Sequence, residues 1–215
     1  MSTALLILSH PSNDSLNAAL ARAVADRLES EGAEVHTVNL YNLDFEPVLR
    51  GEEMQRRFSF EPIIQEQARL VIAADLFVFI HPDWWGGMPA ILHGWIERVF
   101  RPGIAYEFEG PEFGEKSRVP LLSGKYAVVA VTSDQVCPES GHPVERVWRK
   151  HILSFCGISC HSWNILDDLR HTTYRDRRRW ISRVCDETAD AFKTQADALG
   201  GHAKDSESPL STPDP

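Results

Sequence analysis

The chain has 215 residues, of which 43% are hydrophobic and 25% are charged, a composition typical of one globular domain with a sizeable core. Its formal net charge of -9 argues against broad nucleic-acid binding, which needs a positive field. No apolar run approaches the roughly 20 residues that span a bilayer, and the apolar N-terminus has neither a basic leader nor a small-residue cleavage site, so we expect a cytoplasmic protein that does not insert into membranes.

Short apolar runs of strand length alternate with amphipathic helical patterns along the chain. We expect strands at residues 4–8, 34–40, 75–80, 125–131 and 158–165, and helices at 16–31, 61–73, 91–100, 144–155 and 174–199. Parallel strands joined through helices need right-handed crossovers, which place the helices on the faces of the sheet. The sequence therefore predicts an α/β fold, with a five-stranded, doubly wound parallel sheet and helices on both faces.

Three segments stand outside this alternation. The first, from residue 41 to about 60, is expected to be a surface excursion with a short helix near 50–57. The second, 104–123, is expected to be a long loop whose Tyr106, Phe108 and Phe113 could line a dimer interface or cover a site. Residues 200–215 are rich in Ser, Pro, Asp and Glu, so we expect one domain over 1–199 followed by a disordered polar tail.

The cysteines and histidines do not predict a disulfide framework or a metal site. Four cysteines are too few and too scattered for a disulfide scaffold in a chain of this length. Cys156 closes a helical pattern and Cys160 lies in the next strand, so the Cys-x-x-x-Cys-His run is not expected to bind metal.

Ligands of doubly wound sheets bind at the carboxyl ends of the strands, where three loops are expected here: 9–17, 81–89 and 132–142. The first offers hydroxyls, amides and a helix start that suit a phosphate, although Asp14 or Ser15 could simply cap the helix. The second offers Trp84 and Trp85 beside two glycines, and the third offers hydrogen-bonding side chains. The dinucleotide, P-loop and nucleophile-elbow motifs are absent, which leaves a flavin as the remaining common ligand of such a sheet.

Two motifs in these loops also resemble a known family. His10-Pro-Ser-Asn-Asp-Ser-Leu-Asn17 and Pro82-Asp-Trp-Trp-Gly-Gly-Met-Pro-Ala-Ile-Leu-His-Gly-Trp-Ile-Glu-Arg-Val-Phe100 resemble the NAD(P)H:quinone oxidoreductases of the flavodoxin-like superfamily, including the ancillary flavoproteins of potassium-efflux systems. The resemblance implies a homodimer that binds FAD or FMN at the three loops. It further implies reduction by NAD(P)H and reoxidation by a quinone or similar small-molecule acceptor, in a ping-pong cycle.

The resemblance also implies roles for particular residues. Those matching the phosphate-binding positions are His10, Ser15, Leu16 and Asn17. Those framing the isoalloxazine are Pro82, Asp83, Trp84, Trp85 and Gly86, with backbone N–H groups of 83–85 facing the ring. The residues of the third loop that would lie beside the flavin are Thr132, Ser133, Asp134 and Gln135, where family members commonly have Thr-Thr-Gly-Gly.

The chain departs from the family pattern at several of these positions. Asp83 replaces a usual apolar residue and Gly86 a usual aromatic one, so we expect a wider or differently shaped pocket. Asp134 could place a negative charge beside the flavin or point to solvent. The family loop that carries a Tyr and a His is shortened here, which leaves His142 as a catalytic proton donor or, alternatively, a surface histidine before Pro143.

A basic cluster precedes the last helix and allows two interpretations. Its members are Arg170, Arg175, Arg177, Arg178 and Arg179. They form either a solvated helix start or a site for the NADPH phosphate or an acidic partner. The main functional prediction is a flavin-dependent NAD(P)H oxidoreductase. The alternatives are a flavin-binding regulatory subunit that binds peripherally to a membrane transport protein and an electron-transfer flavoprotein.

Overall fold

A computed structural model describes residues 2–55, 59–110, 115–136 and 141–205. Five parallel strands form one sheet in the order β2-β1-β3-β6-β7, with bounds Glu34–Asn39, Thr3–Leu8, Leu76–Pro82, Tyr126–Thr132 and Ser159–Leu166. The predicted α/β class and five-stranded parallel sheet are confirmed, and every predicted strand lies within two residues of its observed bounds.

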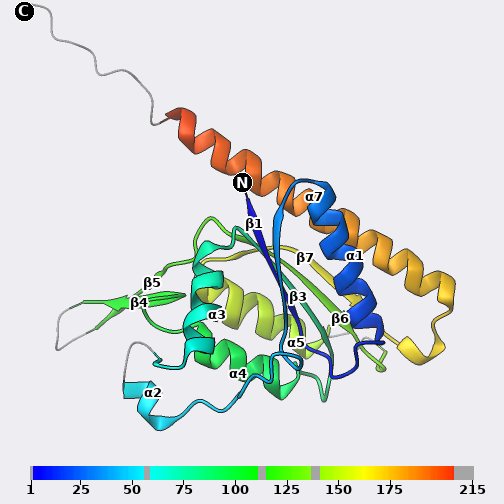
Figure 1. Cartoon of the computed structure of the whole chain (residues 1–215), viewed down its shortest axis with the longest axis horizontal. Helices are drawn as coiled ribbons and strands as arrows, with labels where there is room; N and C mark the ends of the chain where they lie inside the picture. Colours follow the sequence, from blue (N-terminus) through cyan, green and yellow to red (C-terminus); the bar gives the residue numbers. More distant parts are fainter. Residues whose placement is uncertain (1, 56–58, 111–114, 137–140, 206–215) are drawn as a thin grey trace, which may run out of the picture.

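Helices cover both faces of this sheet (Figure 1). Helices α1 (Leu16–Ser30) and α7 (Tyr174–Asp205) pack together on one face. The other face carries α3 (Pro62–Ala73), α4 (Ala90–Val99) and α5 (Pro143–Arg146), while α2 (Gly51–Gln55) lies in the excursion beside α4. Short helices α6 (Ser154–Cys156) and η2 (Leu169–His171) complete the described elements.

Alternating side chains of the strands divide the core into two layers. In β1, Leu5 and Ile7 pack in the layer of α3 and α4, whereas Leu6 and Leu8 pack in the layer of α1 and α7. Buried apolar residues on both faces are what a central parallel strand requires. The strand order reverses between β1 and β3, which places the switch point, and with it the expected ligand crevice, at the carboxyl ends of these strands.

Two predicted elements differ in the structure. The expected loop 104–123 contains an antiparallel hairpin of β4 (Tyr106–Glu109) and β5 (Ser117–Pro120). Tyr106 packs edge-on to Phe108, with ring centroids 5.6 Å apart, and edge-on to Phe155 at 4.9 Å, and these contacts support the hairpin. The helix expected at 144–155 is interrupted by a π-helical stretch, η1 (Val147–Leu153). Helix α7 continues to Asp205 rather than to about residue 199.

Some predictions fall on residues that the structure does not describe. These are Cys137, Phe113, the end of the helix near 50–57 and most of the polar tail, residues 206–215. Within the described part of the chain, no helix is both long enough and apolar enough to cross a membrane.

Candidate functional site

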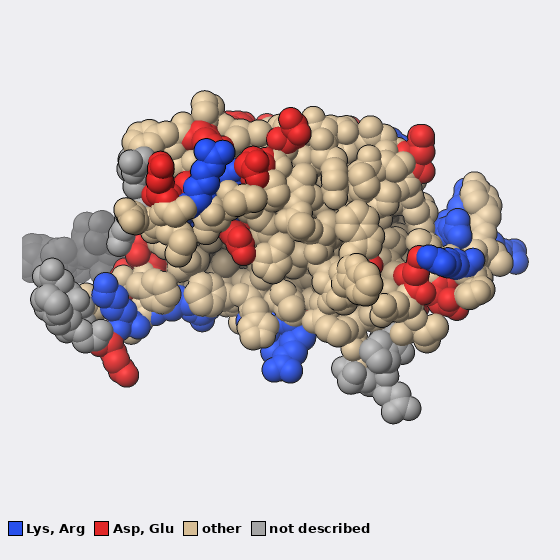
Figure 2. All heavy atoms as spheres, turned by 90° about the horizontal axis from the view of Figure 1, so that it is seen from below, with Lys and Arg blue, Asp and Glu red and all other residues tan. Residues whose placement is uncertain are grey.

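The three strand-end loops meet around a pocket of about 190 Å³. Its walls are His10, Ser15, Leu16, Asn17, Pro82, Asp83, Trp84, Thr132, Asp134 and Leu169. All but Leu169 are predicted site residues, so the structure brings most of the predicted set together. The predicted residues Trp85, Gly86, Ser133, Gln135 and His142 lie outside this lining. Figure 2 views the molecule from the side to which the strands point, and most charged side chains there lie toward the rim.

The first loop presents the start of α1 to the pocket. Ser15 caps the helix, since its hydroxyl accepts a hydrogen bond from the Ala18 backbone N–H at 3.1 Å. Asn17 donates through Nδ2 to Thr132 Oγ1 at 3.0 Å, while its buried Oδ1 has no partner among the described residues. A helix start provides N–H groups without intrahelical acceptors, and these suit an anion.

The second loop makes a tight turn at Trp84–Gly87. Trp84 and Gly87 exchange backbone hydrogen bonds of 2.9 and 3.1 Å, and both central residues, Trp85 and Gly86, have positive φ values of 60° and 77°. This is the geometry of a type I′ turn. A tryptophan in the left-handed region is strained, and Trp85 is fully exposed there, so no buried packing contact of its side chain offsets the strain.

The same turn corrects one expectation about backbone donors. Of the three N–H groups expected to face a ring, that of Asp83 donates to Thr132 O at 2.7 Å and that of Trp84 donates to Gly87 O. These two donors are therefore committed within the protein. Trp84 lines the pocket and is 42% exposed, whereas Trp85 is fully exposed and does not line it.

The third loop is joined to the segment that follows β7. Ser133 N donates to Leu166 O and Leu169 N donates to Ser133 O, both at 2.9 Å, while Asp168 N donates to Gln135 O at 3.1 Å. This ladder places Leu169 in the pocket wall. Sequence reasoning missed Leu169; the available signal was that β7 neighbours β6, so their carboxyl-end loops must be adjacent.

Two arginines of the predicted basic cluster support this wall. Arg170 pairs with Asp134 at 2.9 Å, so the carboxylate at this half-exposed position is compensated. Arg177 donates to Thr172 Oγ1 at 2.9 Å and to Leu169 O at 3.1 Å. Arg177 therefore supports the local structure, whereas Arg170 is a solvated residue with its side chain 78% exposed, as the interpretation of a solvated helix start expects.

His142 is buried, so its interpretation as a surface histidine is wrong. Its side chain is 3% exposed and that of Asp83 is 2% exposed, with His142 Nδ1 lying 3.8 Å from Asp83 Oδ2. Ser133 Oγ donates to the same Oδ2 at 3.2 Å. Asp83 Oδ1 and His142 Nε2 are buried and have no partner among the described residues. A buried acid–imidazole pair thus lies at the pocket, with Asp83 in the pocket lining.

A second buried histidine supports the end of β3. His81 Nδ1 donates to Pro82 O at 2.8 Å, and Nε2 accepts from Trp148 Nε1 at 2.9 Å, which together require the neutral ring. Burial lowers the pKa of His81 to about 4, against the opposing effect of the Pro82 hydrogen bond. The π-helical stretch η1 supplies Trp148 for this contact.

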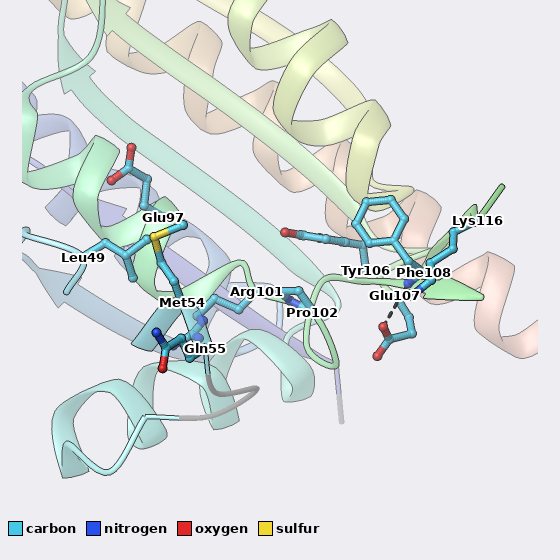
Figure 3. A pocket seen from close by; sticks show the side chains of 10 residues that line it. All are labelled: Leu49, Met54, Gln55, Glu97, Arg101, Pro102, Tyr106, Glu107, Phe108 and Lys116. Carbon is cyan, nitrogen blue, oxygen red and sulfur yellow. Dashed lines mark hydrogen bonds between the residues drawn. The ribbon is translucent and has the colours of Figure 1, made fainter. Parts of the chain in front are cut away.

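A larger cavity of about 480 Å³ lies apart from the three loops (Figure 3). Figure 3 shows Leu49 and Met54 on one side of it and Tyr106 and Phe108 of the hairpin on the other. No predicted cofactor-binding residue lines this cavity. We place the candidate site in the smaller pocket, because two of its lining residues, Asn17 and Asp83, have buried oxygens without partners among the described residues, and such atoms need a ligand or a functional explanation.

Comparisons with known proteins agree with this architecture. The family described as a flavodoxin-like fold matches residues 2–184. This chain belongs to that flavodoxin-like family. It is 35% identical over 195 residues to a Haemophilus influenzae protein named uncharacterized NAD(P)H oxidoreductase, covering 86% of this chain and 93% of the relative. It is 28% identical to NAD(P)H dehydrogenase [quinone] 1 of Rattus norvegicus, covering 79% and 70% of the two chains.

A solved structure of the family is also similar. The Smu.1420 protein of Streptococcus mutans superposes with a TM-score of 0.75 at 31% identity, covering 87% of this chain and 99% of the other. The resemblance to the NAD(P)H:quinone oxidoreductases is confirmed, as is the expectation that this flavodoxin-like protein is an oxidoreductase enzyme.

Proposed function

We propose that this flavodoxin-like protein is a flavin-dependent NAD(P)H oxidoreductase that reduces a quinone or a similar electrophilic, two-electron acceptor. The observation that carries the proposal is the pocket at the carboxyl ends of β1, β3 and β6, which joins a helix start to an exposed indole. The names of the relatives support an oxidoreductase that uses NAD(P)H. In a ping-pong cycle, donor and acceptor would use this site in turn.

The residues present fit a flavin at both ends of the pocket. At the phosphate end, His10, Ser15, Leu16 and Asn17 would hold the anion, and the partnerless Asn17 Oδ1 would receive a donor. At the ring end, Pro82 and Trp84 would provide flat apolar contact. When bound, the flavin accepts hydride from NAD(P)H and passes it to the acceptor, and the chain serves to bind, orient and exclude water.

The size of the pocket bears on assembly. About 190 Å³ is smaller than the roughly 300–1,000 Å³ of typical small-molecule pockets, so this chain alone encloses only part of a flavin. We therefore propose that a second copy of the chain closes the site in a homodimer. The apolar Tyr106 and Phe108 of the hairpin, predicted as interface or cover residues, are the candidates for that contact.

The role of His142 as a proton donor stays a prediction. Its Nε2 atom is buried, so contact with an acceptor requires the loop that carries it to move. Cytoplasmic location likewise stays a prediction, as does the choice between FAD and FMN.

The proposal is tested by the absorption spectrum of the purified protein under anaerobic conditions. We expect flavin bands that NADH or NADPH bleaches and that a benzoquinone restores, with the cofactor then identified after extraction. A flavin-loaded protein that neither nucleotide reduces would contradict the proposal and favour the electron-transfer alternative. A protein that retains no flavin and takes up neither FAD nor FMN would contradict both.

A further inference from the structure

The buried pair of Asp83 and His142 is energetically unusual. Both side chains are almost completely enclosed, and the Nδ1 to Oδ2 separation of 3.8 Å is longer than an ordinary hydrogen bond. Ser133 donates to one carboxylate oxygen, which leaves Asp83 Oδ1 and His142 Nε2 without partners among the described residues. Buried charge with incomplete compensation costs stability, so this pair is more than packing.

The other ionisable groups around the pair carry no competing enclosed charge. The acidic groups of the neighbouring loop and helix are held in solvent-facing ion pairs, which are Asp134–Arg170 at 2.9 Å and Glu145–Arg149 at 2.7 Å. His81, two residues before Asp83, is neutral at pH 7 because burial lowers its pKa to about 4. Among the described residues, Asp83 and His142 are therefore the enclosed pair of ionisable side chains at the pocket.

We infer that Asp83 and His142 set the electron affinity of the flavin through their combined charge, a role that rests on the proposed flavin site. Hydride uptake brings two electrons and one proton, so the ring gains one negative charge. An enclosed carboxylate beside the site opposes that gain, and a protonated imidazole next to the carboxylate offsets the opposition. Asp83 lowers the reduction potential of the flavin and His142 raises it again. Neither residue has to touch the acceptor.

The position of Asp83 supports this role. Its backbone N–H is fixed to Thr132 O at 2.7 Å, and its side chain is fixed by Ser133, so the carboxylate is held between the second and third loops. A charge held by a rigid frame in a water-poor setting acts over a longer distance than a mobile, hydrated one. Because Asp83 also lines the pocket, the pair can act on a ligand bound there.

The test is the midpoint potential of the flavin in the holoenzyme, measured at pH 5.5 against a reference dye. Asp83→Asn should raise the potential, His142→Gln should lower it, and the double variant should lie near the wild type. A unit charge about 10 Å from the reduced ring, at an effective dielectric near 20, should change the equilibrium constant for electron exchange between the flavin and the dye by roughly tenfold. Damage to the fold would not give opposite signs.

Glu145→Gln is the matched control. Glu145 does not line the pocket, and its side chain is 34% exposed and paired with Arg149 at 2.7 Å, so the change should stay under about twofold. Equal shifts in Asp83→Asn and Glu145→Gln overturn the inference and leave the proposed function standing. Shifts of the same sign in Asp83→Asn and His142→Gln do so as well. A protein that binds no flavin overturns the inference and the proposed function together.

Discussion

Glu53 fastens the excursion between β2 and α3 to helix α4 through a buried ion pair. Its carboxylate accepts two hydrogen bonds from the fully buried Arg98 guanidinium, at 2.9 and 3.1 Å. Burial raises the pKa of Glu53, but hydrogen bonds from Arg98 and Ser59 outweigh burial and bring the pKa from 4.5 to about 2. A shift of this size corresponds to roughly 3 kcal/mol of unfolding free energy at neutral pH.

Glu53→Gln should therefore lower the free energy of unfolding by about 3 kcal/mol at pH 7. Because the folded-state pKa is the lower one, the contribution is complete above about pH 4.5 and is lost as the pH falls toward 2. At pH 3 only roughly 1 kcal/mol should separate the variant from the wild type. Urea unfolding followed by tryptophan fluorescence at both pH values measures this difference.

A surface carboxylate provides the control for this experiment. Glu66 pairs with Arg69 at 2.6 Å, but both side chains are at least half exposed, so Glu66→Gln should change the free energy of unfolding much less than Glu53→Gln does at pH 7. A loss in Glu53→Gln that is the same at pH 7 and pH 3 would refute the ion-pair reasoning.

Three further predictions concern single residues. Trp85→Gly should leave the free energy of unfolding unchanged or raise it by up to about 1 kcal/mol, because glycine adopts the positive φ of this exposed position without strain, while turnover of the flavin-loaded enzyme should fall. Urea denaturation and turnover, both measured on the same sample, test this prediction. A lower free energy of unfolding in the variant would contradict it. Gly94→Ala should lower the free energy of unfolding by roughly 1–3 kcal/mol, because the new Cβ would lie 2.1 Å from Pro47 O. Thermal unfolding measures this loss. Gly87→Ala is the control, because a Cβ at Gly87 would have its nearest neighbouring atom 3.8 Å away. His81→Gln should reduce the loss of unfolding free energy that the protein suffers between pH 6.5 and 4. Burial lowers the pKa of His81 to about 4, so the stability that the neutral ring contributes is complete above pH 6.5 and is lost as the pH falls. If the wild type and the variant lose the same unfolding free energy between pH 7 and 4.5, the prediction is wrong.

The central strands were predictable because burial on both faces leaves almost no polar residue in them. In β3, all seven residues from Leu76 to Pro82 are buried, so the apolar run and the strand nearly coincide. The site loops followed from the same logic, since carboxyl ends of parallel strands share one edge. The sequence motifs then identified which side chains of these loops to expect.

Features that depend on contacts between distant segments were not predictable. The β4–β5 hairpin has strands of four residues, too short for a clear period, and its ends are stabilised by Phe155 from another part of the chain. The pairing of Asp83 with His142 joins loops 59 positions apart, and nothing in either local sequence specifies it. The π-helical stretch was not predicted, because apolar spacing alone does not distinguish it from an ordinary α-helix.

The π-helical stretch also joins this helix to the end of β3. A π turn holds more residues than an α turn, so Val147–Leu153 accommodates an extra residue without ending the helix. Trp148 lies within this stretch and donates a hydrogen bond to a ring nitrogen of His81, next to the second loop of the pocket. The irregular turn therefore supports the loop of the candidate site through one buried hydrogen bond.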